Sequence, residues 1–462
     1  MYEKLAKDLD SLPELLDAAR EQAGEWLAGV AERPAAVPPA AFEPSPVPEH
    51  GVGARAALEE FGRRWAPGFA GSAGPRYLGF VTGGATPAAV AGDWLTAAVD
   101  QNPVSALDSS ASDLERETVG WLAGLFGLGP EFSGAFVSGA TMSNVVGLAI
   151  GREWLGEQLG VTVADAGVGA LGPVAVLSGS PHSSALKAMA VLGLGRGALQ
   201  RVPVLPEREA VDVEALERQL AQLGGPALVI ANAGTVNTVD FDDLRAIAAL
   251  KEKYPFWLHV DAAFGGFAAL SPEHAHLVEG LALADSVCVD LHKWLNVPYD
   301  SAIQFSRRLD LQVSVFQNSA AYLGHPGENP DFVHRTPESS RRLRALAAWC
   351  TLAAYGRAGH REIVERCVAL ARDLGDRLAA TGQWRLLAPV RLNVVCFTLA
   401  DDPTQERIDA VVRAVAAGGE TFLTPTVYAG VPALRAAFSN WRTEPQDVDR
   451  ILAALVTGSG AA

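Results

Sequence analysis

Cysteine is scarce in this chain of 462 residues. The four cysteines, Cys288, Cys350, Cys367 and Cys396, lie far apart and form no CxxC pair. Neither a disulfide framework nor a cysteine zinc site is therefore expected, and a reducing, cytoplasmic compartment suits the chain best.

Membrane and targeting signals are also lacking. No apolar stretch reaches membrane-spanning length without charges or glycines, and the N-terminus shows no basic segment followed by an apolar run and a cleavage site. We therefore expect a soluble protein. Apolar residues make up 49% of the sequence, which predicts a sizeable buried core.

An excess of positive charge is missing as well. The formal net charge is -16 at pH 7, with the acidic residues spread along the chain, which argues against nucleic-acid or anionic-membrane binding. The GxGxxG nucleotide fingerprint is absent, and the pair His274 and His276 has no carboxylate-rich partner motif, so no metal site is expected. Small molecules and further copies of the chain are the expected partners.

Three segments of different character follow one another. Residues 1–72 join an amphipathic helical pattern to a proline-rich stretch. Because the apolar helix face needs a surface to cover it, we expect an arm that packs on this or another subunit, not a disposable tail. Residues 73–342 alternate apolar runs with helical stretches, and residues 343–462 combine long helices with two strand candidates. The pattern predicts a large α/β domain followed by a smaller α+β domain.

Five short apolar runs in the large domain are typical of buried parallel strands. They read GAFVSG, VAVLSGS, ALVIANAG, FWLHVDAA and SVCVDL. Ligands of open parallel sheets bind beyond the carboxyl ends of the strands, where loops and helix N-termini converge. Each run is followed there by small or polar residues that suit ligand binding, although each taken alone also fits a helix cap, a turn or a satisfied polar group. These residues are Gly139, Ala140, Thr141, His182, Thr235, Asp261, His292 and Lys293.

One ligand accounts for the whole set. A helix N-terminus binds an anionic group, Asp261 pairs with a cationic ring nitrogen, His182 faces a flat ring, and Lys293 attacks an electrophilic carbon. Pyridoxal 5'-phosphate has this shape, and its protonated ring accepts electrons from the substrate's α-carbon. The sequence therefore predicts a pyridoxal phosphate enzyme.

At these residues the chain resembles the pyridoxal phosphate-dependent group II amino-acid decarboxylases, the family of aromatic amino-acid and glutamate decarboxylases. Within this family it is similar to the bacterial-type members. The resemblance runs from RYLGFVTGG to the C-terminus and is carried by HVDAAFGG, DLHKWLNVPYDS, VSGATMSN and SPHSSALKA. It implies fold type I, an aspartate aminotransferase-like α/β fold with a mainly parallel seven-stranded sheet. It also implies a homodimer with active sites at the interface, to which Gln101 and Asn102 contribute, and an arm laid across the partner.

Residue by residue, the resemblance implies a Schiff base at Lys293, a ring-nitrogen partner in Asp261 and ring stacking by His182. The remaining cofactor contacts that it implies are Ala263 on the other ring face, Thr235 near the ring oxygen, and Gly139, Ala140, Thr141 and His292 around the phosphate.

The reaction depends on a proton donor in a loop. Aligned with the family's catalytic tyrosine is Phe332, which has no proton to give, and His334 or Tyr322 are alternative donors. Decarboxylation of an L-amino acid to the amine is the expected reaction. Oxidative conversion to an aldehyde, another pyridoxal phosphate reaction such as transamination or lyase chemistry, and a non-catalytic homologue stay open. Phe80, Thr82 and Phe332 suggest an apolar substrate wall.

Overall fold

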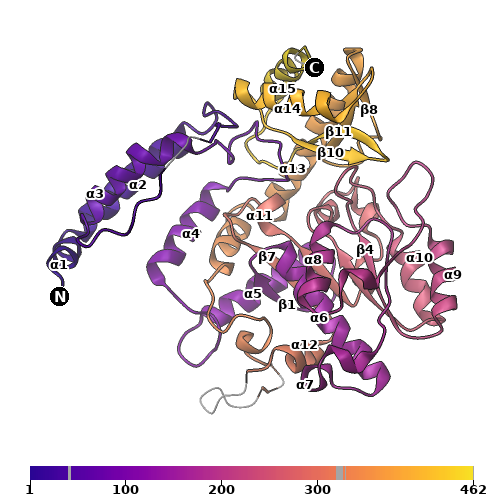
Figure 1. Ribbon diagram of the computed structural model, residues 1–462. Helices are drawn as coiled ribbons and strands as arrows, with labels where there is room; N and C mark the ends of the chain where they lie inside the picture. Colours follow the sequence, from indigo (N-terminus) through magenta and orange to yellow (C-terminus); the bar gives the residue numbers. More distant parts are fainter. Residues whose placement is uncertain (40–42, 319–325, 328, 461–462) are drawn as a thin grey trace.

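The computed structural model describes residues 1–39, 43–318, 326–327 and 329–460. Figure 1 shows a large body, a smaller layer that contains the C-terminus, and an N-terminal arm that projects from the body. The arm consists of α1 (Glu3–Asp10), α2 (Leu12–Ala28) and α3 (Ala54–Arg64). Pro13 lies in the first turn of α2 and so starts a helix, because the missing N–H of proline costs nothing there.

A seven-stranded sheet forms the centre of the body, in the order β1-β7-β6-β5-β4-β2-β3. Strand β7 runs antiparallel to both of its neighbours, and all other pairs are parallel. The strands are β1 (Ser133–Val137), β2 (Val176–Ser178), β3 (Leu199–Arg201), β4 (Ala227–Asn232), β5 (Phe256–Asp261), β6 (Ser286–Val289) and β7 (Ala302–Ser306).

Alternate side chains of the central strands enter two different apolar clusters. In β5, Phe256, Leu258 and Val260 belong to one cluster and Trp257 to the other, as expected from the two-residue period of a strand. Both faces of the sheet are therefore covered, which explains the nearly continuous apolar runs in the sequence. Helices α6 and α8 cover one face (Figure 1). The helices around this sheet are α4 (Pro87–Val99), α5 (Ala111–Leu125), α6 (Ala140–Leu159), α7 (Val163–Ala166), α8 (Ser183–Val191), α9 (Val213–Leu223), α10 (Leu244–Ala249), α11 (Leu291–Trp294) and α12 (Leu309–Phe316).

The smaller layer is an antiparallel sheet of four strands in the order β10-β11-β9-β8. A long helix, α13, leads into it and bends at Gly356, whose φ of 57° lies in the left-handed region. The elements are α13 (Ala345–Ala380), β8 (Trp384–Leu386), β9 (Val394–Leu399), α14 (Gln405–Gly418), β10 (Thr424–Tyr428), β11 (Val431–Ala437) and α15 (Pro445–Ser459).

The five strand runs identified in the sequence are β1, β2, β4, β5 and β6. The domain limits at residues 72 and 342 stay a prediction. The segment before α4 hydrogen-bonds to the smaller layer, for example from the amide of Leu78 to the carbonyl of Phe422 at 2.9 Å. None of the helices in the described part of the chain has the length and apolarity needed to cross a membrane.

Candidate active site

A cavity of about 260 Å³ opens at the carboxyl edge of the large sheet. Strand ends, helix termini and loops at the carboxyl ends of β1, β2, β4, β5 and β6 supply most of its wall, and the segment before α4 and strand β11 of the smaller layer supply the rest. The lining residues are Phe80, Val81, Ala140, His182, Asn232, Gly234, Val236, Asp261, Ala263, Phe264, His292, Lys293, Tyr299 and Arg435.

Lys293 lies on α11, the short helix that follows β6. Its Nζ is 3.4 Å from Oδ2 of Asp290 and 5.5 Å from the ring centroid of Phe264. The backbone of Lys293 is held closely, because a Cβ added to Gly83 would lie 1.8 Å from the Lys293 carbonyl oxygen. Asn296 closes the same contact by donating from Nδ2 to the carbonyl of Gly83 at 2.7 Å.

Asp290 connects the lysine to the neighbouring histidine. Its Oδ1 is 3.0 Å from Nε2 of His292. Burial would raise the pKa of Asp290, but the charge of Lys293 and the contacts with His292 outweigh it and lower the pKa. The ring of His292 packs on Tyr299 with a centroid distance of 4.2 Å. Asp290 therefore stays ionised and holds the side chains of Lys293 and His292 in place.

Asp261 ends β5 with a side chain that is almost fully buried. Oδ2 accepts a hydrogen bond from Nδ2 of Asn144 at 3.0 Å, and Oδ1 accepts one from the amide of Ala263 at 3.2 Å. The carboxylate thus has a fixed orientation at the cavity wall.

His182 is the N-cap of α8, and its Nδ1 accepts from the amide of Ser184 at 3.2 Å. Burial lowers the pKa of His182 below its usual value, against the opposing effect of Asp261, so the ring is neutral at neutral pH. An uncharged imidazole can lie flat against an aromatic ring.

The 20-residue helix α6 begins at Ala140, and no side chain caps its N-terminus. Its first amide groups are free to bind an anion, and the helix dipole favours negative charge there. Gly139 and Ala140 leave this end of the helix open, and His292 lies beside it, since a Cβ on Gly139 would meet Cε1 of His292 at 3.6 Å.

Several residues that the sequence indicated are directed elsewhere. The Thr235 hydroxyl donates to Oε2 of Glu209 at 2.6 Å and does not line the cavity, so a role beside the cofactor finds no support in the geometry. Thr141 is likewise outside the lining, and Thr82 lines a neighbouring groove instead.

The loop residues of the sequence analysis also lie apart from the cavity. Phe332 is fully buried, with the guanidinium carbons of Arg116, Arg335 and Arg341 at 5.1, 4.9 and 4.7 Å from its ring centroid. His334 is buried and accepts from the amide of Asn318 at 3.1 Å. Tyr322 lies outside the described residues. The side chains of Gln101 and Asn102 bond to their own chain, to the Val99 carbonyl and the Arg341 amide, so their contribution to a partner's site stays a prediction.

Sequence reasoning missed seven residues of the wall, namely Val81, Asn232, Gly234, Val236, Phe264, Tyr299 and Arg435. Phe264 and Tyr299 stand inside the two motifs HVDAAFGG and DLHKWLNVPYDS, so proximity to the motifs could have found them. Arg435 is a charged residue in the apolar strand β11, and a buried charge in a strand is a signal of function.

A flat, anionic aldehyde cofactor fits this set of groups. Lys293 supplies the amine, Asp261 a buried carboxylate, the start of α6 an anion site, and Ala140 and Ala263 leave room between them. The fold and the site together define a pyridoxal phosphate enzyme of fold type I. Among the described residues no cluster of three or more metal-binding side chains is present.

Comparison with known proteins gives the family. The family model described as the pyridoxal-dependent decarboxylase conserved domain matches residues 41–400. The chain belongs to this family, and it is a pyridoxal phosphate-dependent amino-acid carboxy-lyase. The predictions of family, fold class, cofactor and enzyme class are confirmed.

Two of the curated relatives carry two different named activities. The chain is 28% identical to an aromatic-L-amino-acid decarboxylase of Bacillus atrophaeus, over 82% of this chain and 80% of the relative. It is 24% identical to a 3,4-dihydroxyphenylacetaldehyde synthase of Aedes aegypti, over 96% and 88%.

Solved structures show the same fold. A structure of Oryza sativa TDC with PLP and tryptamine has a TM-score of 0.90 at 22% identity, and covers 98% of each chain. Catharanthus roseus tryptophan decarboxylase with L-tryptophan has a TM-score of 0.88 at 20% identity, also over 98% of each chain.

Proposed function

We propose that the enzyme decarboxylates an aromatic L-amino acid to the amine and carbon dioxide in the cytoplasm, as a homodimer. The observation that carries this proposal is a buried, unpaired guanidinium, that of Arg435, in the same cavity as Lys293 and Asp261. The cavity thus joins the groups that suit the cofactor to a cation that suits a substrate carboxylate.

The chain's own residues have distinct tasks in this proposal. Lys293 would hold the cofactor's aldehyde carbon, Asp261 its ring nitrogen, and the N-terminus of α6 with His292 its phosphate. His182 would support one face of the ring and Ala263 the other. When bound, the cofactor would supply an electron sink for the substrate's α-carbon, which makes the loss of the carboxylate possible.

Arg435 is well suited to bind the substrate's carboxylate. Its side chain is 6% exposed, and its hydrogen bond to the chain runs from Nη2 to the carbonyl of Phe80 at 3.3 Å. Nε has no partner, and no carboxylate among the described residues forms an ion pair with it. Burial lowers the pKa of Arg435 to about 10, so the group remains charged at neutral pH. A buried cation without a counter-ion is costly, and a bound carboxylate removes that cost.

Aromatic walls favour an aromatic side chain on the substrate. Phe80, Phe264 and Tyr299 line the cavity, and Arg435 is its only guanidinium among the described residues. A second carboxylate, as in a glutamate-type substrate, would have no guanidinium left to bind it. Phe80 is held with a φ of 62°, a left-handed conformation that non-glycine residues rarely adopt and that is typical of functional sites.

The proton that completes amine formation needs a donor. Neither Phe332 nor His334 lines the cavity, whereas Tyr299 does. The hydroxyl of Tyr299 is 3.4 Å from Oγ1 of Thr82 and is the described phenol at this wall that we would test first. Failure of protonation would favour the alternative reaction, in which molecular oxygen is the oxidant and the products are the aldehyde, ammonia and peroxide.

The test is a screen of the proteinogenic amino acids for carbon dioxide release, with each product identified. Carbon dioxide and an equal amount of amine from tyrosine, tryptophan or phenylalanine is the expected result, and Lys293→Ala abolishes it. Aldehyde, ammonia and peroxide in place of the amine would replace decarboxylation by the oxidative reaction. Release from glutamate alone would contradict the aromatic specificity. Tyr299→Phe should shift the product from amine towards aldehyde if Tyr299 is the donor.

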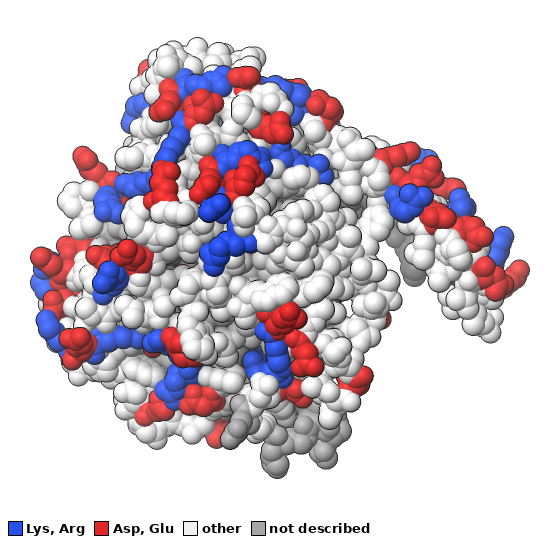
Figure 2. Space-filling view, turned by 180° about the vertical axis from the view of Figure 1, so that it is seen from behind, with Lys and Arg blue, Asp and Glu red and all other residues white. Residues whose placement is uncertain are grey.

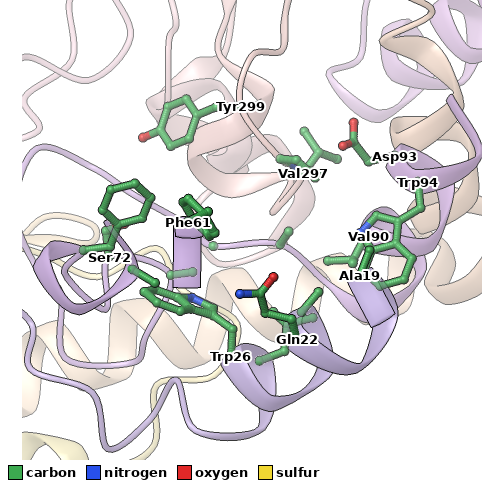
Figure 3. A pocket seen from close by; sticks show the side chains of 18 of the residues that line it. Ala19, Gln22, Trp26, Phe61, Ser72, Val90, Asp93, Trp94, Val297 and Tyr299 are labelled. Carbon is green, nitrogen blue, oxygen red and sulfur yellow. The ribbon is translucent and has the colours of Figure 1, made fainter. Parts of the chain in front are cut away.

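The proposal of a homodimer rests on apolar surface that the single chain leaves exposed. An apolar groove of about 560 Å³ lies between the arm and the body (Figure 3), with Trp26, Phe61 and Trp94 in its wall. No residue of α1, α2 or α3 is buried. Figure 2 shows a wide uncharged surface on the body beside the arm. Exposed apolar surface of this extent marks an interface, and a second copy of the chain offers the same surface in return.

Sedimentation measures this directly. A particle of twice the chain mass of 48.5 kDa is expected, and a stable monomer at micromolar concentration would contradict the dimer.

The cysteines in the described structure are all free, in keeping with a reducing compartment.

A further inference from the structure

A series of buried hydrogen bonds runs from β5 and β6 through α6 to the candidate active site. Nε1 of Trp257 donates to Oγ of Ser286 at 3.0 Å, and this Oγ lies 2.7 Å from Nδ1 of His259. Nε2 of His259 lies 2.8 Å from Oδ1 of Asn144. All four side chains are at most 1% exposed, so water does not compete with these bonds.

The series of hydrogen bonds divides at Asn144. Its Nδ2 donates to Oδ2 of Asp261 and to Oγ of Ser184, both at 3.0 Å. Oγ of Ser184 is 2.7 Å from Nδ1 of His182. One amide group therefore connects Asp261 and His182, the two polar side chains assigned to the ring nitrogen and to one ring face of the cofactor in the proposed site.

The donor and acceptor roles follow from the Asp261 end. The Asp261 carboxylate can only accept, so Asn144 turns its Nδ2 towards it, because the opposite amide orientation would set Oδ1 of Asn144 against Oδ2 of Asp261. Oδ1 of Asn144 then faces Nε2 of His259, which therefore carries the hydrogen. Burial lowers the pKa of His259 to about 4, so the ring is neutral and its Nδ1 accepts from the hydroxyl of Ser286, which itself accepts from the indole N–H of Trp257.

The second branch fixes the tautomer of His182. Oγ of Ser184 accepts from Asn144, which leaves its own hydrogen for Nδ1 of His182. The amide N–H of Ser184 points at the same nitrogen. Nδ1 therefore carries the lone pair and Nε2 carries the hydrogen. Nε2 has no hydrogen-bond partner in the described part of the chain, and His182 lines the cavity.

We propose that Asn144 and Ser184 are positioning residues that hold Asp261 as an acceptor and His182 as an Nε2–H donor. The inference concerns the roles of Asp261 and His182 and so rests on the proposed function. In its terms, His182 donates a hydrogen bond to the bound cofactor or substrate and does not take up a proton there. The fixed amide of Asn144 also prevents the Asp261 carboxylate from rotating away from the ring nitrogen.

The first test reads the tautomers without any turnover. The full-length protein is labelled with ¹⁵N-histidine, and spectra are recorded with pyridoxal phosphate bound and after its removal. The ring signals are assigned with His182→Gln and His259→Gln. At neutral pH both rings should show a protonated Nε2 and an unprotonated Nδ1. A protonated Nδ1 on either ring, in either state, overturns the inference.

The second test uses Asn144→Leu, which has a similar volume and no polar atoms. Its control is Asn393→Leu, since Asn393 is equally buried but donates to the Phe438 carbonyl, outside the cavity lining. Asn144→Leu should lower kcat about 10- to 100-fold with little change in KM, the range found when groups that orient metal ligands are removed. It should also change the absorption spectrum of the bound cofactor, which reports the ring's protonation, whereas the control should leave kcat and spectrum unchanged. Equal losses in both variants would overturn the positioning role.

The two proposals fail in different ways. If Lys293→Ala binds the cofactor with an unchanged spectrum, the proposed site is wrong even when the histidine tautomers are as expected. If Lys293→Ala abolishes the spectrum and the tautomers differ from those given, the site stands and the positioning inference fails.

Discussion

Replacing Arg435 by glutamine should weaken catalysis on the amino acid and leave binding of the amine product unchanged. Glutamine keeps a polar side chain at this position of β11 but removes the charge and the forked pair of donors. A hydrogen bond to a charged group contributes about 1.5–3 kcal/mol. Since about 1.4 kcal/mol corresponds to a factor of ten, kcat/KM should fall by about 10- to 150-fold.

Initial rates of carbon dioxide release give kcat/KM, and inhibition by the corresponding amine supplies the internal control. The amine has the substrate's side chain and lacks its carboxylate, so its inhibition constant should be the same for Arg435→Gln and the parent enzyme. Arg442→Gln is the matched variant, because Arg442 lies over the Trp441 ring at 4.3 Å and is outside the cavity lining. A kcat/KM within twofold of the parent, or an equal loss of amine binding, would refute the assignment of Arg435 to the substrate carboxylate.

Three further results are expected. Gly83→Ala should weaken cofactor binding measured by absorbance titration, because the new Cβ would lie 1.8 Å from the Lys293 carbonyl oxygen; unchanged affinity would show that the backbone adapts. Burial lowers the pKa of His360 to about 4, so the unfolded chain takes up a proton below about pH 6.5 while the folded chain does not. Stability that is present above pH 6.5 is therefore lost as the pH falls, by about 2 kcal/mol at pH 5 for this group, and His360→Gln should flatten the pH dependence of urea unfolding. Arg341 and Glu115 form an ion pair of 2.8 Å in which both side chains are fully buried. Arg341→Met should lower the free energy of unfolding by about 3–5 kcal/mol, because it leaves the Glu115 carboxylate buried without its cation. Adding Glu115→Gln should restore part of this loss, and an undiminished defect in the double variant would contradict the role of the buried charge.

The sequence was sufficient to predict the residues that share one edge of one sheet. Asp261 and Lys293 follow consecutive parallel strands, β5 and β6, and the geometry of a parallel sheet brings such residues together without further information. Arg435 comes from a different sheet, and only the packing of the two layers brings it to the cavity. No pattern of neighbouring residues in the sequence could have predicted that Arg435 lines the cavity.

The hydrogen-bonded network was hidden for another reason. His259 and Asn144 are polar residues inside the apolar segments FWLHV and MSNVVGLA, and such residues are visible in the sequence as exceptions. Their partners follow from how α6 crosses the sheet, which the sequence does not state. The Thr235 prediction shows the reverse case: a hydroxyl at a strand end is taken by Glu209, which lies in a loop 26 residues earlier. A strand-end position therefore predicts that a residue lies near the site. Competing hydrogen-bond partners then decide whether its side chain faces the cavity.

Tyr299 lines both the cofactor cavity and the groove beside the arm. A single side chain thus forms part of the wall of two compartments. In the proposed homodimer, subunit association and cofactor binding would share this side chain, and any change that one makes in the free energy of the other would be reciprocal. Activity per chain should accordingly fall on dilution, and added cofactor should restore it by mass action.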